Sequence, residues 1–180
     1  MGFAIAEEAA SRGASVTLIT GPVHLTTPEQ VYRKDVVSAE EMKNAILHYF
    51  DDSDVLIMAA AVADYKPKVV SDEKIKKKNA KLSLELVKTD DILKEIVKNK
   101  KQQFVVGFAL ETNNEQENAK QKLVHKNLDA IVLNSLNDTG AGFGHDTNKV
   151  TIITANEEKT YTLKSKKEVA VDILNFIEGC

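Results

Sequence analysis

Lysines and carboxylates stand at a few positions where they could act on an anionic ligand. Four lysines fall within the five residues from Lys74 to Lys78, and a lysine carries its charge on a long stem that suits phosphate binding. Lys122 and Lys126 are four residues apart, so they would share one face of a helix. Asp64 follows an apolar stretch and could hold a divalent cation or a ribose hydroxyl. These residue types favour charge neutralisation at a phosphate or carboxylate.

Each of these features also has a purely structural interpretation. The lysine run could be a solvated segment, the lysine pair a solvent-facing stripe and Asp64 the cap of a turn. Asp90 and Asp91 open a predicted helix, where their charge favours contact with a sugar or base over a phosphate. Phe108 ends an apolar strand and could be a core residue or a ring that stacks on a base. The residue types alone leave both interpretations open.

The elements that must position these residues alternate along the chain. Apolar periodicity and capping residues predict helices over 3–12, 38–49, 90–100 (capped by Thr89), 115–126 and 166–177. Buried strands are predicted over 14–20, 54–60, 104–109 and 130–133, the one at 54–60 buried on both faces. A shorter strand is predicted over 31–36, a half-exposed strand over 82–87 and a hairpin of 150–154 with 160–163.

This alternation predicts an α/β, Rossmann-like fold with a mostly parallel sheet, helices on both faces and a C-terminal β-hairpin. No linker or repeat divides the chain, so we expect a single domain over 1–180. Ligands of such sheets bind outside the carboxyl ends of the strands. That rule selects the segments 60–66, 107–114 and 134–138.

The chain opens directly on a helix, whereas a doubly wound fold normally begins with a strand and a phosphate-binding turn. We therefore expect that a first strand and a glycine-rich turn are missing from this sequence. The glycine run at 140–144 does not replace that turn, because it leads into a predicted strand rather than a helix.

Composition narrows the function classes. The 180 residues contain 24 Lys and Arg against 27 Asp and Glu, a net charge of −3 that gives no reason to expect a nucleic acid or membrane partner. The longest apolar run, 55–63, is too short to span a bilayer. The single cysteine, Cys180, excludes an intrachain disulfide and fits a reducing cytoplasm. No P-loop, GxSxG or HExxH motif is present.

Several segments together resemble a known family. AAVADYKP (60–67), KIKK (74–77), VVGFALETNN (105–114) and KNLDAIVLN (126–134), with the opening MGFAIAEEAASRGASVTLITGP, are similar to phosphopantothenoylcysteine synthetase. The family is often the C-terminal half of a bifunctional flavoprotein. The resemblance implies a Rossmann-like homodimer that uses CTP and Mg²⁺ to join 4′-phosphopantothenate to cysteine. It implies FMN only if a decarboxylase domain lies upstream.

The resemblance also assigns roles to residues of this sequence. Lys74 corresponds to a lysine that acts on the triphosphate and in catalysis, and Asp64 is a possible metal ligand. Two segments depart from the family: Asn-Pro-Asp-Ile reads Thr-Asp-Asp-Ile here, and Leu110 replaces a small residue. The implied CTP-binding residues are Met58, Ala59, Ala60, Asp64, Lys74, Asp90, Asp91, Ile92, Leu93, Phe108, Lys122 and Lys126.

Two alternatives remain from the residues themselves. A nicotinamide-dependent, NAD(P)-linked Rossmann reductase would need a Tyr-x-x-x-Lys pair, whereas Tyr161 and Lys164 are three apart and near a predicted hairpin. A non-catalytic nucleotide-binding fragment would bind CTP without forming product. Without its first strand and turn, we expect the chain to bind CTP weakly and to ligate poorly.

Overall fold

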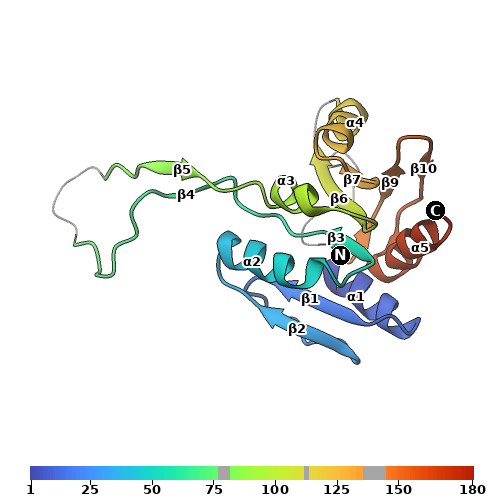
Figure 1. The fold of residues 1–180 in the computed structure, drawn as a ribbon, viewed down its shortest axis with the longest axis horizontal. Helices are drawn as coiled ribbons and strands as arrows, with labels where there is room; N and C mark the ends of the chain where they lie inside the picture. Colours follow the sequence, from blue (N-terminus) through green and yellow to red (C-terminus); the bar gives the residue numbers. More distant parts are fainter. Residues whose placement is uncertain (77–81, 112–113, 136–144) are drawn as a thin grey trace.

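The computed structural model describes residues 1–76, 82–111, 114–135 and 145–180. Helices and strands alternate in it largely as the sequence predicts (Figure 1). The helices are α1 (Gly2–Ser11), α2 (Ala39–Phe50), α3 (Ile92–Ile96), the 3₁₀ turn η1 (Val97–Asn99), α4 (Glu115–His125) and α5 (Lys166–Glu178). The strands are β1 (Val16–Thr20), β2 (Val31–Asp35), β3 (Val55–Met58), β4 (Tyr65–Pro67), β5 (Leu86–Lys88), β6 (Phe104–Glu111), β7 (Ala130–Ser135), β8 (Thr147–Asn148), β9 (Val150–Ile153), β10 (Glu158–Thr160) and β11 (Lys164–Ser165).

The main sheet has five strands in the order β10-β9-β7-β6-β3. Strands β3, β6 and β7 run parallel, and β9 and β10 add an antiparallel hairpin beside β7. The parallel strands β1 and β2 form a separate two-stranded sheet, as do the antiparallel pairs β4-β5 and β8-β11. The predicted α/β fold with a mostly parallel sheet and a C-terminal hairpin is therefore confirmed.

Helices cover both faces of the main sheet, so two hydrophobic cores form. On one face α2, α3 and α4 pack against the sheet, and on the other α1 and α5 do so. The first core contains Met42, Ile46, Phe50, Ile92, Leu93, Ile96, Ala119, Leu123, Val105, Ala109, Ile131 and Leu133, and the second contains Ile5, Val169, Ala170, Ile173, Phe176, Val106, Ala130, Val132, Val150 and Ile152. Side chains that alternate along β6 and β7 point into the two cores in turn.

The prediction that 54–60 is a strand buried on both faces was wrong in part. Strand β3 is shorter, and it forms an edge of the five-stranded sheet. Its first residue, Val55, is 41% exposed, while Met58 is buried. An apolar sequence indicates that a strand could be buried on both faces, but its actual burial also depends on which elements pack beside it.

The predicted half-exposed strand over 82–87 is reduced to β5, which pairs with β4 in a hairpin. This hairpin, the arm (residues 65–76 and 82–88), projects from the body of the molecule (Figure 1). Its apolar side chains therefore lack the sheet neighbours that would bury them. Those more than half exposed are Tyr65, Val69, Val70, Ile75, Leu82, Leu84 and Leu86.

The predicted helix over 90–100 also differs. Helix α3 covers only Ile92–Ile96, and a 3₁₀ turn follows it. The cap is Asp91, whose carboxylate accepts the backbone N–H of Lys94 at 3.1 Å, and not Thr89. In the part of the chain that the structure describes, no helix is long and apolar enough to cross a membrane. The expected cytoplasmic location stays a prediction.

Candidate functional site

The carboxyl ends of β3, β6 and β7 meet at one edge of the sheet, because the three strands are parallel. The segments that follow them are the ones that the sequence selected for ligand binding. Parts of those segments, residues 112–113 and 136–138, lie outside the described residues, as does the whole glycine run at 140–144. The remaining residues are enough to define one rim of the sheet, formed by the loop after β3, the start of α3 and helix α4.

The loop after β3 is tied directly to the start of α3. The backbone N–H of Thr89 donates to the carbonyl of Asp64 at 2.9 Å, and the Thr89 hydroxyl donates to the carbonyl of Ala63. Thr89 thus closes the base of the arm instead of capping a helix. The Asp64 carboxylate is exposed, so it is accessible to a ligand or a cation.

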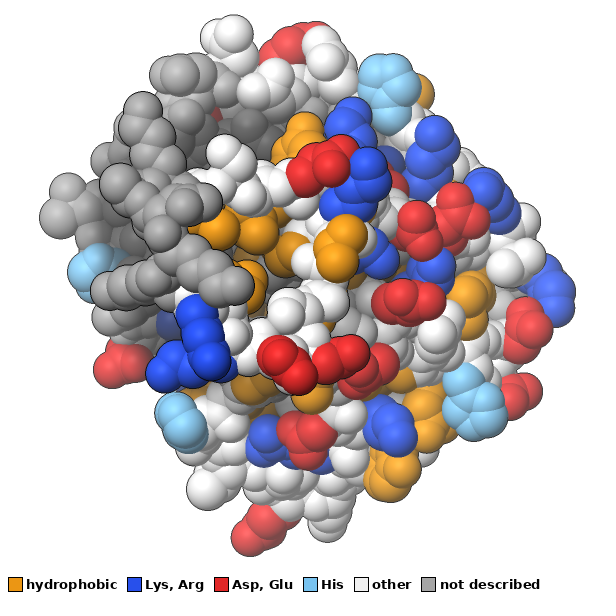
Figure 2. Space-filling model, turned by 90° about the vertical axis from the view of Figure 1, so that its left-hand side faces the viewer, with side chains coloured by type: hydrophobic (Ala, Val, Ile, Leu, Met, Phe, Trp, Pro, Cys, Tyr) orange, Lys and Arg blue, Asp and Glu red, His pale blue; other side chains and the backbone are white. Residues whose placement is uncertain are grey.

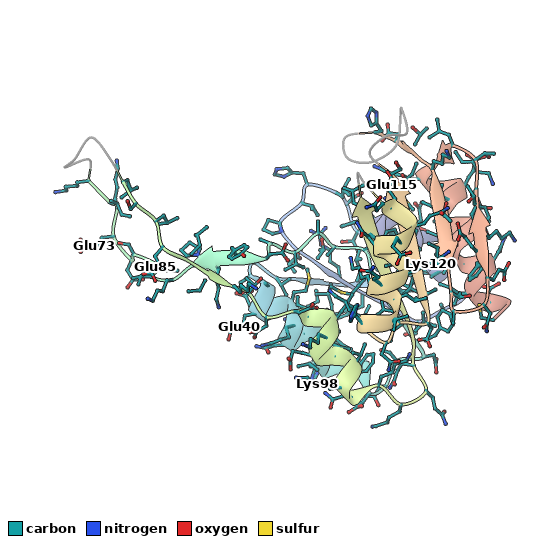
Figure 3. All side chains as sticks on the ribbon, turned by 90° about the horizontal axis from the view of Figure 1, so that it is seen from above. Glu40, Glu73, Glu85, Lys98, Glu115 and Lys120 are labelled. Carbon is teal, nitrogen blue, oxygen red and sulfur yellow. The ribbon has the colours of Figure 1, made fainter. Side chains whose placement is uncertain are left out.

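Helix α4 sends two lysines toward this rim. The Lys126 ammonium lies 2.9 and 3.1 Å from the two carboxylate oxygens of Asp91, and the Lys122 ammonium donates to the Phe108 carbonyl at 2.7 Å. Lys122, in the last turn of α4, and Lys126, its C-cap residue, thus both place their ammonium groups on the sheet side of the helix. In Figure 3, α4 carries Lys120 and Glu115, which mark the helix beside the sheet.

The charge of Asp91 responds to these cations. Partial burial acts to raise its pKa, but hydrogen bonds from Lys126 and the Lys94 N–H, with the nearby charges of Lys126 and Lys122, hold that pKa below its usual value. Asp90 behaves similarly, because a hydrogen bond from Lys43 lowers its pKa. Both carboxylates therefore stay ionised and hold their lysine partners in place.

A glycine fixes the distance between β6 and the segment after α4. A Cβ atom added at Gly107 would come within 2.7 Å of a Leu128 methyl carbon, closer than side-chain atoms approach. Gly107 is buried and stands directly before Phe108. The small residue thus allows α4 to pack close enough for Lys122 to reach the Phe108 carbonyl.

The Phe108 ring lies apart from the two lysines. It packs against the core on the α1 and α5 side, whereas α4 packs on the opposite face. Ile92 and Leu93 are buried, so only their backbone can contact a ligand. Met58 is buried, Ala59 half-buried and Ala60 exposed, which leaves the backbone after β3 accessible at its end.

Lys74, the residue expected to be catalytic, is not brought to this rim within one chain. Its side chain is exposed and it follows Glu73, which Figure 3 shows on the projecting arm, away from the body. Lys77, the last residue of the KIKK motif, lies outside the described residues. The arm therefore holds its lysine apart from Lys122 and Lys126.

A cavity of about 390 Å³ adjoins the rim on the α2 side. It opens between the ends of β1, β2 and β3 and includes Lys43, paired with Asp90, and Lys66, 3.9 Å from Glu40. Its walls are mainly apolar, with charges at the mouth. The lining residues are Gly21, Pro22, Val36, Val37, Ser38, Ala39, Glu40, Met42, Lys43, Ala61, Val62, Ala63, Tyr65, Lys66, Thr89 and Asp90.

Sequence reasoning selected the segment 134–138 but did not single out Asn134. Within the described part of the chain, the Asn134 side-chain oxygen is buried and accepts no hydrogen bond. It lies beside Leu110 in the β6-β7 register and on the same face as Phe108. The sequence feature that could have identified Asn134 is a polar residue at the end of the apolar strand AIVLN. A buried oxygen without a hydrogen-bond donor destabilises the fold, so such an oxygen points to a ligand that supplies the donor.

The described residues contain no group of three or more His, Cys, Asp or Glu that could hold a metal ion by itself. This arrangement is compatible with Mg²⁺ as the companion of a nucleotide, because Mg²⁺ commonly takes one or two carboxylates and completes its shell with phosphates and water. Asp64 is the carboxylate available for that role.

The fold and this rim match a class of α/β domains from pantothenate metabolism. Residues 1–180 match the family model described as the DNA/pantothenate metabolism flavoprotein C-terminal domain, and the chain belongs to this family. The resemblance found in the sequence is thereby confirmed.

Two curated relatives and one solved structure show the extent of the similarity. A protein named cysteine/cysteine sulfinic acid decarboxylase, from an unknown prokaryotic organism, is 51% identical over 98% of this chain and 50% of its own length. The coenzyme A biosynthesis bifunctional protein CoaBC of Bacillus subtilis (strain 168) is 47% identical over 98% of this chain and 44% of its own length. The crystal structure of the C-terminal domain of a CoaBC protein superposes with a TM-score of 0.83 at 40% identity, covering 98% of this chain and 80% of that one.

The chain thus spans about half the length of the curated relatives that it matches. Their names differ although their identities to this chain are similar, so a name alone does not assign an activity to the chain. The chemistry has to be argued from the rim itself.

Proposed function

We propose that residues 1–180 act as one CTP-binding ligase domain that joins 4′-phosphopantothenate to cysteine, a reaction of coenzyme A biosynthesis. The observation that carries this proposal is the convergence of Lys122 and Lys126 on the rim where the Asp64 loop and the start of α3 are tied together. Membership of the pantothenate family supports the same substrate class.

The first step would form an acyl-cytidylate. A carboxylate oxygen of 4′-phosphopantothenate attacks the α-phosphorus of CTP, a new P–O bond forms, and the bond to the β-phosphate breaks to release pyrophosphate. Both reactants are anions, so the rim must lower their repulsion. Lys126 and Lys122 supply positive charge, and Mg²⁺ held by the phosphates and Asp64 would supply more.

The second step would form the amide. The cysteine nitrogen attacks the activated carbonyl carbon, a C–N bond forms, the bond to the CMP oxygen breaks and the amine loses its proton. This step needs a good leaving group and correct positioning rather than a covalent enzyme intermediate. The rim is suited to it, because its contribution is fixed charge and backbone groups.

We place the acid substrate beside Asn134 and Phe108, on the α1 side of the same strand ends. The unpartnered Asn134 oxygen can accept a hydrogen bond from an amide or hydroxyl of the pantothenate chain. The half-buried Phe108 ring offers apolar contact next to it. This arrangement would put the acid and the nucleotide on neighbouring sides of one sheet edge.

We also propose that the chain forms a homodimer through the arm. The arm exposes apolar side chains that one chain cannot bury, and a long exposed apolar hairpin is a typical association surface. An arm that packs on a second copy would also bring Lys74 to that copy's rim. Acidic and basic side chains are mixed over the face that Figure 2 shows, so no single-sign field opposes such contact there.

A direct test measures both half-reactions with purified chain. Pyrophosphate release should require CTP, Mg²⁺ and 4′-phosphopantothenate together, and CMP with an amide product should appear only when cysteine is added. Pyrophosphate release without the acid, or CTP binding with no release, would contradict the ligase. The second result would instead favour the nucleotide-binding fragment.

The reductase alternative finds no support in the geometry. Lys164 is paired with Asp172 at 2.7 Å, and its ammonium lies 5.8 Å from the centre of the Tyr161 ring. Tyr161 directly follows β10, at the opposite edge of the main sheet from β3, and Lys164 lies in β11 just before α5. A thermal shift by NADPH and none by CTP would reverse this preference.

A further inference from the structure

The start of α3 is held from two sides by lysines of other helices. On the α2 side, the Lys43 ammonium donates to the Asp90 carboxylate. On the α4 side, Lys126 contacts both carboxylate oxygens of Asp91, the next residue along the chain. These four side chains, the clasp (Lys43, Asp90, Asp91 and Lys126), link three helices that pack on the same face of the sheet. In Figure 3, α2, which carries Glu40, lies beside α3.

The pair on the α2 side is not an ordinary surface ion pair. The Lys43 side chain is only 18% exposed, whereas that of Asp90 is 68% exposed. Both residues line the cavity beside α2, so the stem of Lys43 is packed in its wall. A lysine with a packed stem loses less side-chain freedom on pairing than a fully exposed one, which is the main reason why exposed pairs contribute little. Lys43 can therefore fix the position of Asp90.

The charges around Lys43 also depend on its ammonium group. Its hydrogen bond to Asp90 raises the pKa of Lys43, and the nearby carboxylates of Glu40 and Glu95 add to that rise. Removal of the ammonium would leave these three carboxylates close together beside the rim. Their uncompensated negative charge would repel the phosphates of a nucleotide there.

The position of Asp90 is passed on to Lys126 through the backbone. Asp91 directly follows Asp90, and its carboxylate both caps α3 and binds the Lys126 ammonium. On its other side Asp90 follows Thr89, which is bonded to the loop after β3. Because the three residues are consecutive, a displacement of Asp90 moves the carboxylate that holds Lys126.

We propose that Lys43 is a positioning residue for CTP binding. It acts through Asp90 and Asp91, holds the Lys126 ammonium in place at the rim and cancels carboxylate charge beside it, without touching the nucleotide itself. This inference rests on the proposed function, because the clasp is assigned to the CTP step. It adds a residue of α2, a helix from which the sequence selected no site residue.

The test measures CTP affinity, turnover and local opening in variants of the 180-residue chain. Lys43→Met should raise KM for CTP about 3- to 10-fold in pyrophosphate release and change kcat by less than about two-fold, because the residue positions a binding cation and not a reacting group. Lys43→Arg should return KM to within about two-fold of wild type. Lys43→Gln should repeat the loss, which guards against misfolding of the methionine variant.

A second readout needs no nucleotide. The Lys94 N–H donates to the Asp91 carboxylate, so its hydrogen exchange reports on the clasp directly. In Lys43→Met this amide should exchange at least ~3-fold faster than in wild type, and in Lys43→Arg at the wild-type rate.

A double-mutant cycle tests the route through Asp90. In the Asp90→Asn background, Lys43→Met should raise KM for CTP by less than about two-fold further, because the partner is already altered. Lys101→Met is the matched control and should leave KM unchanged. Lys101 forms the same kind of pair, 3.0 Å from Asp51, at the other end of α2.

The outcomes separate this inference from the proposed function. A wild-type chain that binds no CTP would overturn both. Where wild type binds CTP, the positioning role alone is overturned by an unchanged KM in Lys43→Met, by an equal loss in Lys101→Met, or by a failure of Lys43→Arg to restore KM. A loss of the same size in the Asp90→Asn background, or an unchanged Lys94 exchange rate, would also overturn it.

Discussion

The rim and the arm both carry lysines that could neutralise phosphates, but they hold them differently. Lys126 is only 25% exposed and is fixed by two contacts with Asp91, and Lys122 is fixed by the Phe108 carbonyl. Lys74 is exposed on a hairpin that projects from the body. A charge in the rim is preorganised, whereas a charge on the arm has to be delivered by closure or by a second chain. Preorganised charges favour nucleotide binding, and delivered charges favour the step that follows it.

If the arm delivers its charge at the chemical step, Lys74 should matter most for turnover. We expect Lys74→Gln to lower kcat for pyrophosphate release roughly 10²- to 10³-fold. The thermal midpoint should stay unchanged, because the side chain is exposed. Lys76→Gln, two residues further along the same exposed stretch, is the control and should change kcat less than a few-fold. Unchanged turnover in Lys74→Gln would remove the catalytic role of the arm.

The second prediction tests whether the arm contributes Lys74 to the rim of its own chain or to the rim of a second copy. Within one chain the arm points away from the rim, so we expect Lys74 to act on the second copy of a dimer. Lys74→Gln and Lys126→Gln chains, unfolded together, refolded as a mixture and assayed at CTP concentrations below the raised KM of Lys126→Gln, should reach about a quarter of wild-type activity, since hybrid dimers then hold one intact site. The control refolds each variant alone. No gain in a mixture shown to contain hybrids would mean that each arm serves its own chain.

The third prediction concerns the rim and tests CTP binding rather than turnover. Lys126→Gln should raise KM for CTP roughly 10- to 100-fold, the usual loss for one charge-assisted contact. Lys120→Gln on the same helix is the matched control, because Lys120 pairs with Glu158 at 3.0 Å instead of facing the rim. Isothermal titration with CTP separates the two variants. Equal losses in both would mean that the helix contributes only general positive charge.

Asn134 tests the α1 side of the same edge. We expect Asn134→Leu to raise the free energy of unfolding by about 1 kcal/mol, because it removes a buried oxygen without a described partner. The same change should lower kcat/KM for 4′-phosphopantothenate about 10-fold and leave CTP binding unchanged. Urea unfolding and steady-state kinetics measure the two effects. Asn175→Leu, at an exposed position of α5, serves as the control.

These two regions also show how far the sequence could predict the molecule. The helices and the parallel strands follow from local periodicity, and the segments that the edge rule selected follow β3, β6 and β7 in the structure. Their role in ligand binding stays a prediction. The partners could not be predicted. Thr89 looks like a helix cap locally, but its hydroxyl donates to the Ala63 carbonyl, 26 residues earlier in the chain. Pairing over such separations depends on the assembled fold rather than on neighbouring residues.

The face of the sheet to which each side chain points could not be predicted either. Phe108 and Lys122 were expected together, yet the Phe108 ring and helix α4 pack on opposite faces of β6. The alternation of side chains along a strand predicts that Phe108 and Ala109 point to opposite sides, but not which side meets α4. The exposure of Val55 could not be predicted either, because it reflects the edge position of β3 among the described strands and not its own sequence.

The smallest expected effect concerns the stability of the rim. Because the folded state holds the pKa of Asp91 below its ordinary value, this carboxylate stabilises the fold above that value, and its contribution is lost as pH falls through the lowered pKa. Asp91→Asn should therefore reduce the free energy of unfolding at pH 7 by less than about 1 kcal/mol, since the pair is partly solvent-screened. Asparagine keeps the helix cap, so the loss reports the charge. The difference from wild type should shrink as urea titrations move toward pH 3, whereas Asp52→Asn, an exposed carboxylate after α2, should show little difference at either pH. A deficit in Asp91→Asn that stays constant with pH would mean that packing, and not the ion pair with Lys126, holds this side of the rim together.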